Sequence, residues 1–424
     1  MATGNLNIQG LPRAWVVGLL GTLYFSQGLP FGFFTQSLPV LLREAGVSLA
    51  GIGLVNLLAL PWALKFLWAP LVDRTAPGPG GKRLWILPLQ VLTSLALLAC
   101  AALEPEGSMR GILGIVLFVN LMAATQDIAT DGLAVDVLLP QERGWANGLQ
   151  VAAYRAGMVV GGGIILMLLE RLGWRWSMLG MAAVMLLATI PVWRWRAPVG
   201  DMVVQRAETN ADHRPANGAA RLGFWRRTGA IPLFLLIVSY KVGDALAGAM
   251  IRPWMVDSGM TMTEIGFVLG TVGFVSALAG ALTGGGLVQR LGRRTALLAF
   301  GFAQAAALAG FWLCAVSAPT AALVLVGVSV EHFVSSMATA ALFTCMMDWT
   351  RPEFPAGDYT IQASAVVVSS GVAAAVSGLL AEQWGYGIVF GTGALLAFVV
   401  TSAVLLFPSS WFVSRQASTE TPMA

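Results

Sequence analysis

Three aspartates and an asparagine lie along one apolar run of the sequence, residues 110–138. In a helix, Asn120, Asp127 and Asp131 share one face, because they are seven and four residues apart. Asp136 is nine residues past Asp127, so it points to the opposite side of the helix and lies about 13 Å further along the axis. Carboxylates within an apolar run are costly and mark functional sites by default. We therefore expect Asp127 and Asp131 to line a cavity or a proton path, and Asp136 to belong to a gate.

Lysine and arginine occur in neighbouring apolar runs. Lys65 is followed one turn later by Trp68, and a lysine beside tryptophan could hold a carboxylate or aromatic ligand. The lysine could equally extend towards the end of its helix. Asp127 and Asp131 could also simply pair with Lys65 or Arg155 and fix the packing of the helices.

Lys241, Gly248 and Arg252 share one face of the run at 229–256, and Asp244 lies one turn from Lys241. This basic stripe could bind an anionic substrate. Alternatively, Lys241 and Asp244 could neutralise each other.

The run at 318–348 carries Glu331 next to His332, with Ser335 and Thr339 on the histidine face. Histidine titrates near physiological pH, so the pair could couple transport to protons. It could also be a hydrogen-bonded packing element.

The first apolar run presents Tyr24, Gln27, Phe31 and Thr35 on one broad face, and Pro30 should kink it. The candidate substrate-binding residues are Tyr24, Gln27, Phe31, Lys65, Trp68, Asn120, Gln126, Gln150, Tyr154, Arg155, Tyr240, Lys241, Arg252 and His332. The candidate proton-coupling residues are Asp127, Asp131, Asp244 and Glu331.

The composition shows what must position these side chains. Of the 424 residues, 57% are hydrophobic and 11% are charged, whereas soluble proteins carry roughly 25% charged residues. This excludes disorder, a collagen-like fibre and an ordinary cytosolic enzyme, and argues against a nucleic-acid binder. A membrane-spanning helix needs roughly 20 apolar residues. Twelve such runs occur, at 14–42, 48–71, 84–103, 110–138, 145–170, 176–195, 229–256, 262–288, 294–315, 318–348, 360–381 and 385–408.

The distribution of Lys and Arg predicts the orientation of these spans. With both termini in the cytoplasm, 17 of the 25 basic residues fall on the cytoplasmic side and five on the outer side. The polar stretch 196–228 would then be a cytoplasmic linker.

The two halves of the sequence resemble each other. Asp136 and Gln150 match Asp348 and Gln362 at an offset of 212 residues. Likewise, Gly46-x-Ser48-x3-Ile52-Gly53 matches Gly259-x-Thr261-x3-Ile265-Gly266, and Tyr24 matches Tyr240. The pattern predicts an all-α integral membrane protein of twelve transmembrane helices in two pseudo-symmetric six-helix halves, which resembles the major facilitator fold. The predicted organisation is 1–195 for the first half, 196–228 for the linker, 229–415 for the second half and 416–424 for a tail.

Two loops support the repeat. Asp73-Arg74 followed by Gly81-Lys82-Arg83, and Gly285-x3-Gln289-Arg290-x-Gly292-Arg293-Arg294, resemble the major facilitator signature G-x3-D-R-x-G-R-R. The first loop carries a Pro- and Gly-rich insertion, and the second has glutamine in place of the acid. The charges could form a gate or could simply be the usual cytoplasmic excess of cations. The candidate gate residues are Asp73, Arg74, Arg83, Asp136, Arg290, Arg293 and Asp348.

Longer strings resemble one branch of this superfamily more specifically. They are YFSQGLPFG at 24–32, KFLWAPLVDR at 65–74, KRLWIL at 82–87 and ATQDIATD at 124–131. Together they resemble the AmpG-like branch, which includes muropeptide permeases, acetyl-CoA transporters and the RhtX/FptX siderophore permeases. Twelve spans, without two additional helices, resemble the RhtX/FptX group most.

The resemblance implies a proton-driven secondary transporter of the bacterial inner membrane that works by alternating access. The leading expected substrate is a siderophore or its iron complex, and the alternatives are a muropeptide or an acetyl-CoA-like anion. A membrane-embedded enzyme or receptor would be a different class. No G-x4-G-K-[ST], HExxH or Gly-x-Ser-x-Gly motif occurs, which argues against ATP use and against an enzyme. We expect a monomer in the lipid bilayer that binds protons and a small anionic substrate, with no cofactor, metal or nucleic acid.

Overall fold

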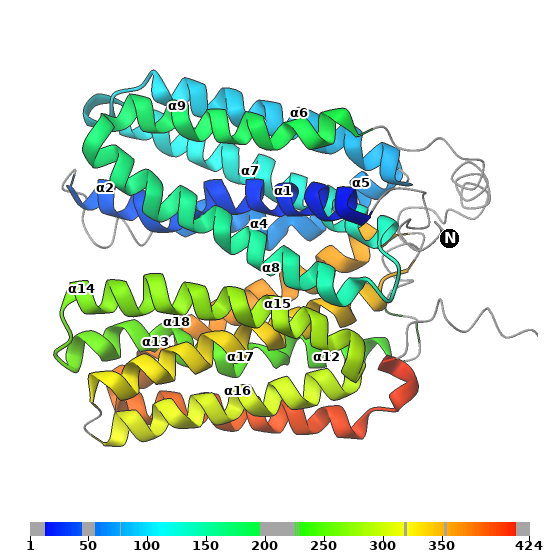
Figure 1. Cartoon of the computed structure of the whole chain (residues 1–424), viewed down its shortest axis with the longest axis vertical. Helices are drawn as coiled ribbons and strands as arrows, with labels where there is room; N and C mark the ends of the chain where they lie inside the picture. The colour runs from blue at the N-terminus through cyan, green and yellow to red at the C-terminus, as the bar shows by residue number, and fades with distance from the viewer. Residues whose placement is uncertain are drawn as a thin grey trace, which may run out of the picture. The chain divides into compact units, whose positions relative to one another are not determined.

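The computed structural model describes residues 13–44, 56–76, 78–195, 225, 227, 229–317, 320–351 and 354–412 (Figure 1). Every regular element in these ranges is a helix. The first half of the sequence forms α1 (Arg13–Gly32), η2 (Phe33–Ser37), α2 (Leu38–Glu44), η3 (Asn56–Ala59), α4 (Leu60–Leu64), η4 (Lys65–Leu67), α5 (Ala69–Thr75), α6 (Gly78–Ala101), α7 (Pro105–Val137), α8 (Arg143–Val159), η5 (Val160–Ile164) and α9 (Ile165–Arg194).

The second half repeats the all-helical pattern. It forms α12 (Ala230–Tyr240), α13 (Val242–Asp257), α14 (Met262–Ile265), η6 (Gly266–Gly273), α15 (Phe274–Leu291), α16 (Arg293–Val316), α17 (Ala321–Asp348), α18 (Pro355–Ala403), η7 (Val404–Leu406) and η8 (Ser409–Phe412).

In the part of the chain that the structure describes, these helices divide into twelve successive segments that correspond to the twelve predicted spans. Within the described ranges, nine helices are long and apolar enough to cross a membrane by themselves. α18 covers two predicted spans and breaks at Gly385, where φ is +79°. A second break at Gly173, where φ is +78°, separates the span that begins with α8 from the remainder of α9. Glycine adopts this left-handed conformation without steric cost, so both breaks work as tight turns between spans.

The second span is broken where the sequence suggested a continuous helix at 48–71. Its first residues lie outside the described ranges, and from Asn56 to Thr75 it consists of η3, α4, η4 and α5. Pro61 and Pro70 lack the backbone N–H that a continuous helix needs, which explains the short segments. Lys65 and Trp68 therefore lie at the break.

Many large apolar side chains are exposed on the described helices, among them Leu84 (69%), Trp193 (66%) and Leu379 (62%). In water such a surface would drive aggregation, but next to lipid tails it is the expected outer surface. The polar candidates from the sequence are concentrated among the buried residues.

The chain divides into two compact units. The first contains the described residues of Met1–Leu139, Ala153–Arg214 and Arg351–Ser364, and the second those of Pro140–Ala152, Pro215–Thr350 and Ala365–Ala424. Each unit therefore includes one short segment from the opposite half of the sequence. These segments are the beginnings of α8 and α18.

In the first unit, α1 crosses α8 and η5 at backbone contact. A Cβ added at Gly28 would lie 2.0 Å from the carbonyl oxygen of Tyr154, and one at Gly161 would lie 1.8 Å from that of Leu29. Small residues let membrane helices approach in this way. The π-helical segment η2 follows Pro30, and the Ser37 hydroxyl donates to the Gly162 carbonyl in η5 at 2.7 Å. The irregularity predicted from Pro30 thus takes the form of a π turn.

The core of the second unit is aromatic. Trp254 packs edge-on against Phe311 and Phe390, with ring centroids 5.9 and 5.8 Å apart. Glycines again allow close packing, because a Cβ at Gly280 of α15 would lie 2.0 Å from the Phe333 carbonyl oxygen of α17. This contact fixes α17, which carries the polar candidates of this unit.

Candidate functional site

A buried ion pair lies at the break in the second span. The Lys65 ammonium pairs with the Asp127 carboxylate of α7, and the two residues are 3% and 8% exposed. The Asp131 carboxylate, one turn further along α7, accepts a hydrogen bond from the Tyr24 hydroxyl at 3.1 Å. Asp127 and Asp131 therefore share one face of α7, as their spacing predicts. The sequence analysis left open whether Lys65 binds a ligand or pairs with one of these acids, and in this structure it pairs with Asp127.

An aromatic cluster surrounds this ion pair. Phe31 lies 5.6 Å from Trp62 and 5.8 Å from Tyr154, measured between ring centroids. Trp68 packs against the same cluster. The Lys65 ammonium lies 5.6 Å from the centroid of the Trp62 ring, within the range of a cation–π contact.

The indole N–H groups hold the cluster in place. Trp62 donates to Asn120 at 3.3 Å, and Trp68 donates to Thr125 at 3.2 Å, so both rings are fixed against α7. The rings of Phe31, Trp68 and Tyr154 are only half-buried. The first unit thus offers partly exposed aromatic surfaces beside a buried cation and its carboxylate partner.

Gln27 and Gln126, both predicted to bind substrate, are fully buried. Gln126 donates to the Ser26 hydroxyl at 3.1 Å, and Gln90, which the sequence analysis did not single out, does the same. These bonds join α1, α6 and α7. Neither side-chain polar atom of Gln27 has a hydrogen-bond partner among the described residues.

The second unit holds a compact polar cluster at the break between α12 and α13. The Lys241 ammonium lies 2.7 Å from an Asp244 carboxylate oxygen and donates to the Ser335 hydroxyl at 3.0 Å. Ser335 in turn donates to Asp244 at 3.1 Å. His332 Nδ1 lies 2.6 Å from Glu331 Oε2. Lys241 and Asp244 therefore neutralise each other, as one of the two sequence-based alternatives stated.

Arg252 and Tyr240 do not join this cluster. Arg252 is exposed, because the break at Lys241 interrupts the helical register that would have placed the two cations on one face. The Tyr240 hydroxyl donates to the Leu297 carbonyl at 2.7 Å and anchors α12 to α16. The expected basic stripe of Lys241 and Arg252 therefore does not form in this structure, and the Tyr240 hydroxyl, which was expected to bind substrate, is bonded to the backbone.

The first gate candidate, Asp73 at the end of α5, is 5% exposed. Its carboxylate accepts hydrogen bonds from the backbone N–H groups of Ala356 and Gly357, at 3.1 and 2.6 Å. The Lys82 ammonium binds the same carboxylate at 2.9 Å. The Asp73 carboxylate thus lies against the N-terminus of α18, and helix N-termini attract negative charge.

Lys82, and not Arg83, is therefore the cation at Asp73. Arg83 donates to the carbonyls of Val192 and Trp193 at 2.9 and 2.8 Å, which satisfies the C-terminal end of α9. The sequence analysis missed Lys82 because Lys82 and Arg83 are adjacent. Which of the two side chains faces Asp73 depends on the orientation of α6, which the sequence does not show.

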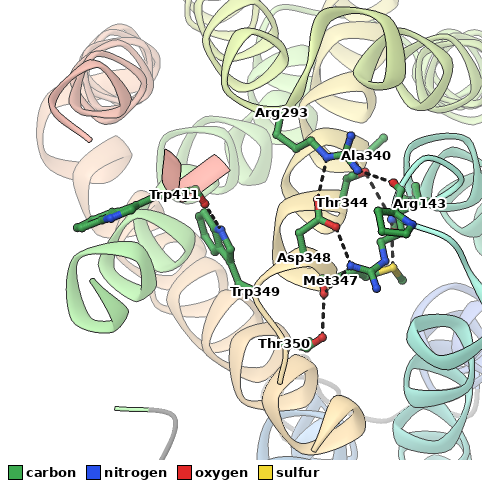
Figure 2. Close-up of polar contacts among 11 residues, drawn as sticks. Arg143, Arg293, Ala340, Thr344, Met347, Asp348, Trp349, Thr350 and Trp411 are labelled. Carbon is green, nitrogen blue, oxygen red and sulfur yellow. Dashed lines mark hydrogen bonds and ion pairs between the residues drawn. The ribbon is translucent and has the colours of Figure 1, made fainter. Parts of the chain in front are cut away.

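A second cluster forms around Asp348 at the end of α17 (Figure 2). One carboxylate oxygen lies 2.7 Å from Arg143 and the other 2.8 Å from Arg293. Asn147 of α8 donates to the Arg143 carbonyl at 2.7 Å, one turn back along the helix. Arg293 and Asp348 were predicted as gate residues, whereas Arg143 was missed, because a single basic residue before a helix carries no distinctive pattern.

The remaining predicted residues occupy varied surroundings. Gln150 is buried, Arg290 is exposed, and three others are half-buried: Arg74, Asp136 and Arg155.

Comparison with known families agrees with this architecture. The model of the Major Facilitator Superfamily matches the chain twice, over residues 20–243 and 233–422. The chain belongs to this superfamily. The paired matches are what an internal repeat predicts, and the protein is a multi-pass membrane transporter of the superfamily.

Relatives place the protein within the AmpG-like branch. The anhydromuropeptide permease of Escherichia coli K12 is 31% identical over 393 residues, which cover 92% of this chain and 78% of the relative. The putative transporter AmpG 4 of Rickettsia conorii is 25% identical over 395 residues, covering 91% and 94%. These names favour the muropeptide alternative over siderophore import and give no support to a particular closeness to the RhtX/FptX group.

Solved structures share the fold. The fucose:proton symporter FucP of E. coli superposes with a TM-score of 0.71 at 14% identity, covering 92% of this chain and 99% of that one. The proton:xylose symporter XylE gives 0.70 at 13% identity, covering 93% and 94%.

Proposed function

We propose that this transporter of the superfamily imports an anhydromuropeptide across the bacterial inner membrane, driven by the proton gradient. Such a molecule combines a sugar with a peptide that carries carboxylates. One observation supports this choice above others, namely the half-buried aromatic rings beside the Lys65–Asp127 pair in the first unit. Ligand sites of this kind combine apolar aromatic walls with a few fixed polar groups.

Each part of the proposed ligand has a suitable counterpart. Phe31, Trp68 and Tyr154 offer ring faces on which the apolar face of a sugar can pack. The Lys65 ammonium has three N–H donors, so it can bind a substrate carboxylate while it keeps its contact with Asp127. The E. coli anhydromuropeptide permease, as the 31% identical relative, supports the same substrate class.

Uptake into proteoliposomes tests the proposal. With an inward proton gradient, labelled anhydromuropeptide should accumulate, whereas a ferric siderophore and acetyl-CoA should not. Accumulation of the siderophore alone would refute the proposed substrate.

A matched pair of tryptophan variants tests the site. Trp68→Ala should weaken anhydromuropeptide affinity roughly fivefold, which corresponds to about 1 kcal/mol of lost aromatic contact. Trp176 is 65% exposed, so Trp176→Ala should leave the affinity unchanged. Equal effects of the two substitutions would contradict an aromatic binding site at Trp68.

A further inference from the structure

The polar cluster of the second unit contains a buried acceptor that no described donor satisfies. Asp244 Oδ2 is bound by Lys241 and Ser335, but Asp244 Oδ1 is buried and receives no hydrogen bond from the described residues. The carboxyl group within hydrogen-bonding reach of Asp244 is that of Glu331, which is 5% exposed. Two carboxylates cannot donate to each other, so this contact requires a proton.

Charge balance leads to the same requirement. With both acids ionised and His332 neutral, Lys241 would leave one negative charge uncompensated in a low-dielectric environment, which is costly. One additional proton makes the cluster neutral. His332 could hold it, but its Nδ1 is 2.6 Å from Glu331 Oε2 without the alignment of a hydrogen bond. The unsatisfied Asp244 oxygen is the better acceptor.

Among the described residues, the titratable groups nearest to the cluster are not positioned to replace this proton. The Tyr240 hydroxyl is bonded to the Leu297 carbonyl, and Cys345 is buried on α17 near that tyrosine. On the η6 side, His332 packs its ring edge against Gly273, where a Cβ would lie 3.0 Å from Nε2. With its side chain 23% exposed, His332 offers a path by which a proton can reach Glu331.

The first unit has the same charge count, with Asp127 and Asp131 against Lys65, but it differs in its hydrogen bonds. Each carboxylate there has its own donor, the Lys65 ammonium for Asp127 and the Tyr24 hydroxyl for Asp131, so no contact between two carboxyl groups has to be bridged by a proton. We propose that Asp244 and Glu331 hold one proton between them and form the proton-carrying site of the transporter, with His332 as its entry. The inference rests on the proposed function in so far as protons drive transport.

Carboxylate-to-amide variants test it. Glu331→Gln places a permanent donor opposite Asp244 and so fixes the protonated arrangement. Glu264 provides a matched control in the same unit: Thr261 donates to it through its N–H and hydroxyl, both at 2.8 Å, and these bonds hold the pKa of Glu264 below its usual value. Glutamine preserves this cap, so Glu264→Gln should behave as the unsubstituted protein.

In proteoliposomes, Glu331→Gln should lose gradient-driven accumulation of anhydromuropeptide but still exchange labelled for unlabelled substrate. Unchanged accumulation in this variant would overturn the inference. So would an equal loss in Glu264→Gln.

A measurement without substrate separates this inference from the proposed function. The infrared C=O band of a protonated carboxyl group should be present in the purified transporter and in Glu264→Gln, and absent in Glu331→Gln and in Asp244→Asn. If the band persists in both of the latter, the proton is held elsewhere and the inference is wrong, and loss of the band in Asp127→Asn or Asp131→Asn would then place it in the first unit. If anhydromuropeptide is not transported at all, the proposed function fails while the band still decides where the proton is held.

Discussion

Lys65 and Asp127 are buried together, and each compensates the charge of the other. Removing one charge leaves the partner uncompensated, which in buried ion pairs costs more than removing both. Their pairing also explains how a lysine can lie at the middle of an otherwise apolar segment. The contact between α7 and the broken second span therefore combines a paired charge with apolar packing.

We predict that Lys65→Gln and Asp127→Asn each destabilise the protein by about 3 kcal/mol. The double variant should recover more than half of that loss, because it leaves two neutral amides that can hydrogen-bond. Thermal unfolding of the purified proteins in the same detergent measures the stability of the two single variants and the double variant. If the double variant is as unstable as the sum of the single ones, the two charges do not stabilise each other.

The spacing along α7 was sufficient to predict that Asp127 and Asp131 share a face, since a regular helix needs only its period. It could not identify Lys82 and Arg143 as partners of acids. Lys82 is nine residues from Asp73, but that carboxylate is positioned by Ala356, 283 residues away, and Arg143 meets Asp348 across 205 residues. Such pairings depend on the tertiary arrangement, whereas loop cations look alike in the sequence because all follow the same charge bias.

The element scale adds constraints that individual residues do not reveal. Pro61 and Pro70 explain why the second span is broken, whereas the sequence analysis expected one continuous run at 48–71. The π turns η2 and η5 could not be predicted from the sequence, because they pack against each other and share the Ser37 hydrogen bond. Their geometry follows from the crossing of two helices and not from either helix alone.

Glycine contacts at this crossing lead to a second prediction. A Cβ at Gly161 would lie 1.8 Å from the Leu29 carbonyl oxygen, whereas one at Gly163 would have no atom within 4 Å. Gly161→Ala should therefore lower stability by about 1–3 kcal/mol through overpacking. Gly163→Ala should change it by less than about 0.5 kcal/mol, as expected for a substitution away from such contacts. Equal melting temperatures for the two variants would contradict the close crossing.

Asp73 connects α5 to the first turn of α18, and a third prediction follows from this contact. Asp73→Asn keeps the shape but removes the negative charge from the helix N-terminus and leaves the buried Lys82 ammonium without its partner, at a cost of about 3 kcal/mol. Because Asp73 is not part of the aromatic site, transport should fall while the affinity for anhydromuropeptide stays unchanged. Uptake and equilibrium binding on the same preparation distinguish these effects.

Arg83→Gln is the control for that experiment. Arg83 binds carbonyls of α9 and not Asp73, so its loss should lower thermal stability without lowering transport per folded molecule. If Arg83→Gln reduces transport as Asp73→Asn does, the gate includes Arg83, as the sequence pattern suggested.

At the scale of the whole molecule, the internal repeat explains the composition of the two units. The beginning of α8, Pro140–Ala152, groups with the second unit, and Arg351–Ser364 groups with the first. These segments correspond through the repeat, since Gln150 matches Gln362 at the offset of 212. The sequence predicted two equivalent halves, but it could not predict this exchange, which depends on contacts formed at distant positions.

The charge bias leads to the last prediction, which concerns orientation. Seventeen basic residues on one side against five on the other should retain that side in the cytoplasm, because cationic loops are translocated poorly. Reporter fusions at Arg214 and at Ser418 should therefore give a cytoplasmic signal. An even number of spans separates these positions, so they must agree with each other whatever the orientation. Fusions at Gly107, in the first turn of α7, and at Gly259, between α13 and α14, should give the periplasmic signal. A periplasmic signal at Arg214 alone would mean that the first half has an odd number of spans, and a reversal at all four positions would mean that the charge bias does not orient this protein.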